Sequence, residues 1–66
     1  MWIKTESGII NTDNLEHVYR ARGGEHEYWV EASTITGDLI LYTTHDAKEA
    51  DGYIGRLGDL LDARWV

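Results

Sequence analysis

Apolar and polar residues alternate along two segments in the first half of the chain, with the period of two that is typical of β-strands. The segments span about 15–22 and 25–35, and both are rich in β-branched and aromatic residues. Between them lies Gly23-Gly24. Adjacent glycines accept the positive φ angles that a two-residue hairpin turn requires. We therefore predict an antiparallel hairpin with these glycines at its turn.

A two-residue turn also fixes which residues lie opposite each other, because the two strands are then paired outward from it. Two of the expected pairs have opposite charges, Arg22 with Glu25 and Arg20 with Glu27. The other two are Val18 with Trp29 and Tyr19 with Tyr28. This register also places the like charges Glu16 and Glu31 opposite each other, which costs stability.

Alternation along the hairpin then defines two faces of the predicted sheet. The predicted core side carries Leu15, His17, Tyr19, Ala21, His26, Tyr28, Val30 and Ala32. The predicted solvent side carries Glu16, Val18, Arg20, Arg22, Glu25, Glu27, Trp29, Glu31 and Ser33.

Three further short strands complete the prediction. Trp2–Thr5 and Gly8–Asn11 are expected as strands around a turn at Glu6-Ser7, and a turn at Gly37-Asp38 precedes a strand at 39–44. Because residues 39–44 are apolar on both faces, we expect an interior position in the sheet.

From Asp46 onward the apolar period changes to that of a helix. Asp46 with Glu49 forms a capping-box-like start. The stripe that follows consists of Ala47, Ala50, Ile54, Leu57 and Leu61. This predicts an amphipathic helix over about 47–63 that covers the core side of the sheet. The expected fold is thus a single α+β domain, residues 1–66, with an antiparallel β-meander of about five short strands and one C-terminal helix packed on one face.

Composition restricts the function more than it identifies it. The chain of 66 residues contains no cysteine, which excludes disulfides, thiolate metal sites and a thiol nucleophile and fits a cytoplasmic setting. We expect no signal peptide, because the first residues lack a long apolar run, and no membrane span, because no stretch approaches about 20 apolar residues.

Catalytic patterns are weak. The three histidines, His17, His26 and His45, lack the spacing of metal ligands and are interpreted as structural. Glu27 and Glu31 could form an acid–base pair, but they lie on the predicted solvent side without an apolar pocket to separate their pKa values. We therefore expect no enzymatic activity, no cofactor and no metal.

The net charge of −6 is concentrated in residues 23–51, where seven acidic residues stand against Lys48 alone. A field of one sign repels its own compact state and favours a basic partner. It also argues against direct binding to nucleic acid or to anionic lipid, which requires clustered Lys and Arg.

Two resemblances bear on function. The opening Met1-Trp2-Ile3-Lys4-Thr5-Glu6-Ser7-Gly8, with Asn11, Asp13 and Asn14, resembles the starts of short bacterial and phage-borne proteins of unknown function. The small size, acidity and segregated carboxylates are similar to those of anti-CRISPR proteins. That resemblance implies an inhibitor in the host cytoplasm that occupies the DNA-binding surface of a CRISPR effector, and it assigns no residues.

The leading hypothesis is a non-enzymatic inhibitor that offers carboxylates, in place of phosphates, to a basic nucleic-acid-binding site on another protein. The expected contact residues are Glu25, Glu27, Trp29, Glu31, Asp38 and Asp51, with Trp29 as the aromatic anchor. The alternatives are a homodimer formed through the Trp29 face and a Trp29 that packs flat on its own sheet. Gly52, Gly55 and Gly58 in the predicted helix indicate either close approach of another backbone or simple tolerance.

Overall fold

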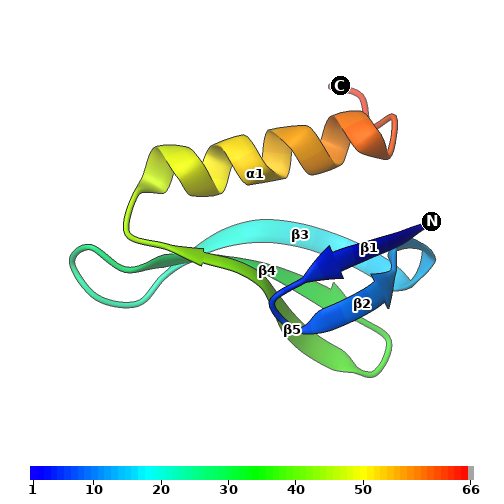
Figure 1. Ribbon diagram of the computed structural model, residues 1–66, viewed down its shortest axis with the longest axis horizontal. Coiled ribbons are helices and arrows are strands. Elements are labelled where there is room, and N and C mark those ends of the chain that lie inside the picture. Colours follow the sequence, from blue (N-terminus) through cyan, green and yellow to red (C-terminus); the bar gives the residue numbers. More distant parts are fainter. Residues whose placement is uncertain (66) are drawn as a thin grey trace.

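The computed structural model describes residues 1–65, and it contains five strands followed by one α-helix (Figure 1). The elements are β1 (Trp2–Thr5), β2 (Gly8–Asn11), a short 3-10 helix η1 (Thr12–Asn14), β3 (Leu15–Arg22), β4 (Tyr28–Thr34), β5 (Gly37–Thr44) and α1 (Ala47–Leu60). All pairings are antiparallel, so the predicted α+β fold class is confirmed. The strands divide into two sheets, β1-β2 and β3-β4-β5.

Helix α1 begins where the sequence predicts. Asp46 is the N-cap, and its carboxylate accepts a hydrogen bond of 2.9 Å from the backbone N–H of Lys48. The reciprocal half of a capping box is not formed, because the Glu49 carboxylate accepts instead from the hydroxyls of Thr44 and Tyr42. The helix ends at Leu60, three residues before the predicted end, where Asp62 adopts a left-handed φ of 57°. A residue in this conformation stops a helix and turns the chain away.

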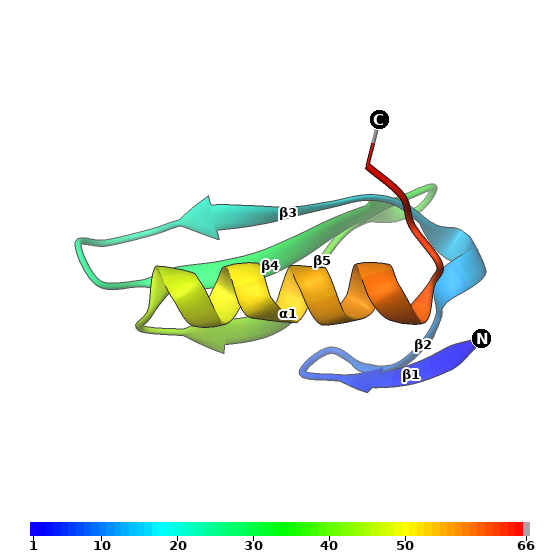
Figure 2. The same cartoon turned by 90° about the horizontal axis from the view of Figure 1, so that it is seen from above.

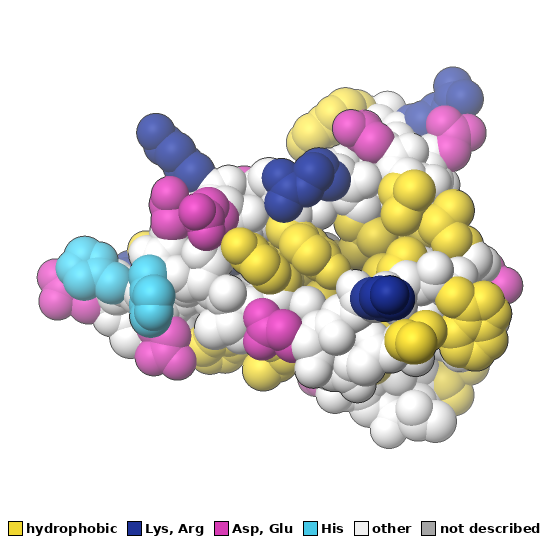
Figure 3. Space-filling view, in the orientation of Figure 1, with side chains coloured by type: hydrophobic (Ala, Val, Ile, Leu, Met, Phe, Trp, Pro, Cys, Tyr) yellow, Lys and Arg dark blue, Asp and Glu magenta, His cyan; other side chains and the backbone are white. Residues whose placement is uncertain are grey.

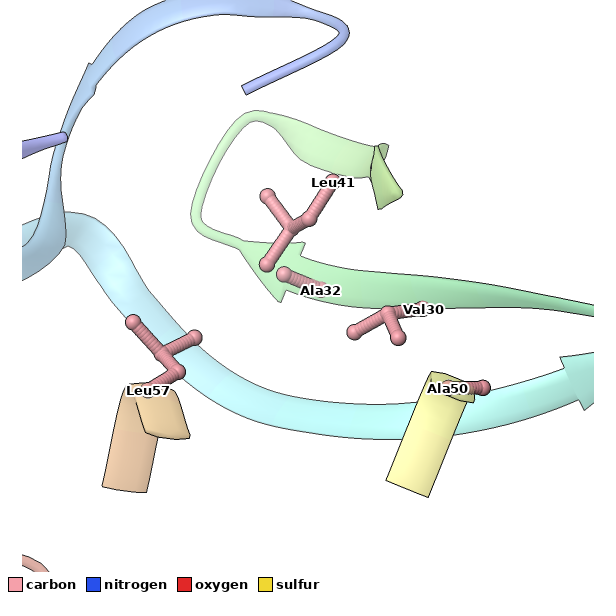
Figure 4. Packing of buried hydrophobic residues seen from close by; sticks show 5 residues of the cluster. All are labelled: Val30, Ala32, Leu41, Ala50 and Leu57. Carbon is pink, nitrogen blue, oxygen red and sulfur yellow. The ribbon is translucent and has the colours of Figure 1, made fainter. Parts of the chain in front are cut away.

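The hydrophobic core lies between α1 and the β3-β4-β5 sheet. Among the described residues it contains five buried side chains, Val30, Ala32, Leu41, Ala50 and Leu57 (Figure 4). Viewed from above, α1 runs along the sheet, with β3 on one side of it and the β1-β2 sheet on the other (Figure 2). Tyr42 and Tyr53 stack at the edge of this core, with ring centroids 5.0 Å apart. The core is small, and two of its five side chains are alanine.

The predicted register of the β3-β4 hairpin is wrong. Arg22 lies opposite Tyr28 rather than Glu25, so the two strands are shifted by three positions from the predicted pairing. Residues 23–27 form a five-residue loop, which the N–H of Gly23 closes by donating to the carbonyl of Glu27 at 2.9 Å. Exposed charge pairs, such as Arg22 with Glu25, contribute only about 0.2–1 kcal/mol each, which is too little to set the register against the burial of β4.

Because the shift is an odd number of residues, it exchanges the two faces of β3. Val18 and Arg20 lie opposite Ala32 and Val30, on the side covered by α1, and Tyr19 lies opposite Glu31 on the other side. The prediction that His17, Tyr19 and Ala21 belong to the core side is therefore wrong, although the same prediction is correct for Tyr28, Val30 and Ala32 of β4. The predicted opposition of Glu16 and Glu31 does not occur either.

Strand β5 is an edge strand of its sheet rather than an interior one. Its outer edge is covered by the β1-β2 turn. The N–H of Glu6 donates to the carbonyl of Leu41 at 3.2 Å, and the Ser7 hydroxyl donates to the carbonyl of Ile40. The Glu6 carboxylate accepts from both the N–H and the hydroxyl of Thr43. A side-chain carboxylate thus satisfies an edge N–H that would otherwise be available to another strand.

Candidate functional site

The face of the β3-β4-β5 sheet away from α1, called the open face below, carries the residues with the most distinctive chemistry. Alternation and register place on it His17 and Tyr19 of β3, Trp29, Glu31 and Ser33 of β4, and Asp38 and Ile40 of β5. Helix α1 packs against all three strands from the opposite side (Figure 1). Three of the residues expected at a binding site, Trp29, Glu31 and Asp38, therefore share a face with Tyr19.

Glu31 holds two aromatic side chains in place on this face. One of its carboxylate oxygens accepts from the Tyr19 hydroxyl across the strands, and the other accepts from the Trp29 indole N–H at 3.0 Å. The ring of His17 lies against Tyr19, with centroids 4.8 Å apart. Both oxygens of a solvent-facing carboxylate are thus used to fix neighbouring rings, and this reduces the rotamer freedom of all three side chains.

The same contacts shift the pKa values of Tyr19 and Glu31 in opposite directions. The hydrogen bond to Glu31, together with partial desolvation and the charges of Glu31 and Asp38, raises the pKa of Tyr19 to about 12. The hydrogen bonds from Tyr19 and then Trp29 lower the pKa of Glu31, because they stabilise the ionised carboxylate. Around neutral pH the cluster is therefore a carboxylate between two neutral donors, which suits the display of negative charge rather than proton transfer.

The indole of Trp29 packs against Gly23 of the hairpin loop. A Cβ on Gly23 would stand 2.6 Å from Cζ3 of the indole and 3.4 Å from the carboxyl carbon of Glu27. The absence of a side chain at position 23 is thus what lets the ring settle there. This arrangement matches the alternative in which the tryptophan packs on its own sheet, and the side chain remains partly exposed.

The six residues expected at the site do not form one surface. Trp29, Glu31 and Asp38 share the open face, and Glu25 and Glu27 belong to the loop at its end. Asp51 lies on α1, at the opposite side of the sheet, where it accepts from Arg20 at 3.0 Å. It is therefore both separated from the open face and paired with a base.

The acidic residues of segment 23–51, called the acidic block, are closer to basic residues in the fold than they are along the sequence. Arg20 and Arg22, which precede the block along the chain, lie beside it in the fold, and Arg22 donates to the carbonyls of Gly24 and Glu25. Asp46 and Glu49 serve the start of the helix. Even so, Figure 3 shows acidic and histidine side chains gathered at the end of the molecule that contains the β3-β4 loop and the start of α1. Hydrophobic side chains dominate the other end, near β1 and β2.

Catalytic or metal chemistry has little support in the described residues. No three His, Asp or Glu side chains among residues 1–65 lie close enough together to hold a metal ion. His45 Nδ1 lies 3.1 Å from the backbone carbonyl of His26, and the ring of His17 rests on Tyr19, so two of the three imidazoles have contacts that hold them in the fold. A Cβ on Gly55 would meet open space, one on Gly58 would make an ordinary contact of 3.8 Å with Ala63, and one on Gly52 would stand 3.3 Å from the guanidinium of Arg56, so no backbone approaches these glycines closely within residues 1–65.

Sequence reasoning missed the role of Tyr19 because the predicted register turned it toward the core. It also missed the edge-covering role of Glu6 and an apolar cleft between the two sheets, described below. No local pattern signals any of these, since each depends on residues distant in sequence.

Helix α1 is too short and too polar to cross a membrane, and it is the only α-helix within residues 1–65. Searches of protein-family models, curated proteins and solved structures found no match to this chain.

Proposed function

We propose that the protein is a non-enzymatic, acidic binding module that inhibits a nucleic-acid-binding protein by covering its basic site. The observation that carries this proposal is the Tyr19-Glu31-Trp29 cluster, in which one carboxylate fixes two aromatic rings on the open face of the sheet. In this role the carboxylates take the place of phosphates, as the resemblance to anti-CRISPR proteins implies.

Arginine is the side chain that such a face fits best. Its planar guanidinium stacks on an indole or phenol ring and pairs with a carboxylate at the same time. The open face offers both kinds of group side by side, with Asp38 near Glu31 and with Glu27 beside the Trp29 ring. Because the rings are already fixed, little side-chain entropy is lost when a partner binds.

The contact set that supports the proposal is smaller than the one expected from sequence. It comprises Glu25, Glu27, Trp29, Glu31 and Asp38, and it omits Asp51 because of its pairing with Arg20 on the other side of the sheet. Complementary charge of this kind acts mainly on association rate and on partner choice.

Charge reversal tests the proposal without disturbing the cluster itself. In Glu27→Lys/Asp38→Lys, two acids beside the cluster change sign while Glu31 keeps its two hydrogen bonds. Asp59→Lys is a control for charge reversal away from the open face, because Asp59 is exposed and lies on α1, on the other side of the sheet. Each variant and the parent are immobilised and exposed to lysate of a bacterial host at low and high salt, with and without added duplex DNA.

The proposal expects the parent and Asp59→Lys to retain a nucleic-acid-binding protein at low salt and to release it to DNA or to high salt. The double reversal should weaken retention by about tenfold or more. Equal retention by all three proteins, or retention that DNA does not compete with, contradicts the proposal. Circular dichroism of each variant checks that the fold persists.

The alternative expectation, a homodimer through the Trp29 face, gains no support from this geometry. Joining two copies across the open face would bring Glu31 and Asp38 of one copy against those of the other, and like charges in contact are costly.

A further inference from the structure

An apolar cleft of about 430 Å³ lies at the end of the molecule away from the β3-β4 loop, between the β1-β2 sheet and the β4-β5 turn. The residues that line it are Trp2, Ile9, Ile10, Asn11, Asn14, Leu15, Thr34, Ile35, Thr36 and Leu39. No ionisable side chain is among them. In a chain with a net charge of −6, this neutrality sets the cleft apart.

Three large side chains at the cleft are left in water. Ile35 is 86 % exposed, Trp2 is 69 % exposed and Ile9 is 65 % exposed. They come from different elements, β1, β2 and the β4-β5 turn, yet they border the same hollow. Scattered exposed apolar residues are ordinary, but three large ones that border the same cleft indicate a surface that another molecule covers.

We propose that a second copy of this chain covers the cleft, so that Trp2, Ile9 and Ile35 of the two copies meet around a two-fold axis. Two-fold association requires a patch that complements itself, and an uncharged apolar patch does so in many orientations. The acidic side chains gathered at the end with the β3-β4 loop make that end less suited to self-association than the cleft. Two copies that meet here keep their acidic loops, with Glu25 and Glu27, at the far ends of the dimer.

The small size of the chain also supports a second copy as the molecule that covers the cleft. Within residues 1–65, only Val30, Leu41 and Leu57 are large buried apolar side chains, whereas the cleft alone exposes three that are as large or larger. Chains of this length bury a small fraction of their surface, and many complete their core by oligomerising. A standard interface covers about 800 Å² on each partner, roughly a sixth of the 4873 Å² surface of this chain.

Analytical ultracentrifugation over a range of concentrations tests the proposal. The parent should form dimers, and raising the NaCl concentration from about 0.05 to about 0.5 M should strengthen them, because salt screens the repulsion between two anionic copies. The variant Ile35→Glu places a charge in the patch and should raise the dimer dissociation constant by about a hundredfold. Leu60→Glu is the matched control, because Leu60 is 53 % exposed and lies outside the cleft.

The dimer proposal is overturned if the parent remains a monomer at roughly 1 mM in the higher salt. It is also overturned if Ile35→Glu dimerises as the parent does, or if Leu60→Glu weakens the dimer equally. Saturable binding of an apolar peptide to a parent that stays monomeric would assign the cleft to another partner instead. Since the proposed inhibitor contact weakens with salt and the dimer strengthens, the two proposals fail separately.

Discussion

The two faces of the β3-β4-β5 sheet are stabilised in different ways. The face under α1 is held by burial of Val30, Ala32 and Leu41 against the helix. The open face is held by hydrogen bonds from Tyr19 and Trp29 to one carboxylate. Burial contributes about 25 cal/mol per Å² and tolerates no charge, whereas an exposed polar cluster contributes little and keeps its charge available.

This difference indicates a division between folding and binding. Substitutions under the helix should unfold the chain, whereas substitutions on the open face should alter the charged and aromatic groups exposed for binding while the fold persists. The small size of the core makes the contrast sharper, because a domain of this length has only a few kcal/mol of net stability to lose.

The largest effect is expected for Leu41→Ala. Leu41 is 1 % exposed, and leucine-to-alanine changes in a core cost about 2–5 kcal/mol. We expect a loss that leaves much of the population unfolded at 25 °C, as measured by urea denaturation followed by circular dichroism. Leu60→Ala, at an exposed helix position, is the control and should change stability by less than about 0.5 kcal/mol. A fully folded Leu41→Ala would show that the helix-covered face is not the main source of stability.

Gly23→Ala should have the next largest effect, and it acts through the open face. The added methyl would collide with the Trp29 ring at 2.6 Å, so the ring or the loop must shift, at a cost of about 1–3 kcal/mol. The measurement is the free energy of unfolding together with the near-ultraviolet circular dichroism of the indole. Gly24→Ala is the control, because its nearest contact is an ordinary 3.7 Å to a Glu27 oxygen. Equal behaviour of the two variants would contradict the packing of Trp29 against Gly23.

Glu6→Ala tests the outer edge of β5, which is covered by the β1-β2 turn and not by residues on either face of the sheet. The Thr43 N–H loses its acceptor, and we expect about 1 kcal/mol of destabilisation. The sharper readout is amide hydrogen exchange, which should accelerate at Thr43 more than at Val30 in the middle of the sheet. An unchanged exchange rate at Thr43 would argue that the β1-β2 turn does not cover this edge.

Glu31→Gln should have the smallest effect near neutral pH, because the amide oxygen still accepts one hydrogen bond. Its effect is on pH dependence. The lowered pKa of Glu31 means that its stabilisation is present above the usual carboxyl pKa of 4.5 and is lost as the pH falls below it. The variant should therefore unfold less steeply in acid than the parent.

The same variant reports on Tyr19. The raised pKa of about 12 means that the stabilisation by this phenol is present below pH 10 and is lost as the pH rises toward 12. Removing the charge at position 31 should bring one tyrosinate absorbance transition back toward pH 10, whereas Glu16→Gln should leave all transitions in place. No change in either titration would contradict the hydrogen bond between Tyr19 and Glu31.

Much of the fold could be predicted from local pattern. The strands Trp2–Thr5 and Gly8–Asn11 and the Asp46 cap were predicted correctly, because each depends on neighbours a few residues away. The candidate site was predicted in part, since Trp29, Glu31 and Asp38 do share a face. Asp51 did not join them, because the helix that carries it lies across the sheet.

The hairpin shows why the remainder could not be predicted. Its turn glycines and charge pairs favoured one register, but the loop from 23 to 27 and the packing of Trp29 over Gly23 produced another. The energies that separate the two registers come from contacts formed only after both sheets and the helix are assembled. Those contacts cannot be inferred from the pattern of residues along the sequence.

The sequence by itself determined the classes of element, the position of the helix start and the net negative charge, since these depend on local propensity and on composition. Only the tertiary structure decided which face of β3 meets the helix, which acids are neutralised and where the uncharged cleft lies. Strand register, ion pairing and the clustering of exposed apolar side chains at the cleft all depend on contacts between residues that are far apart along the chain.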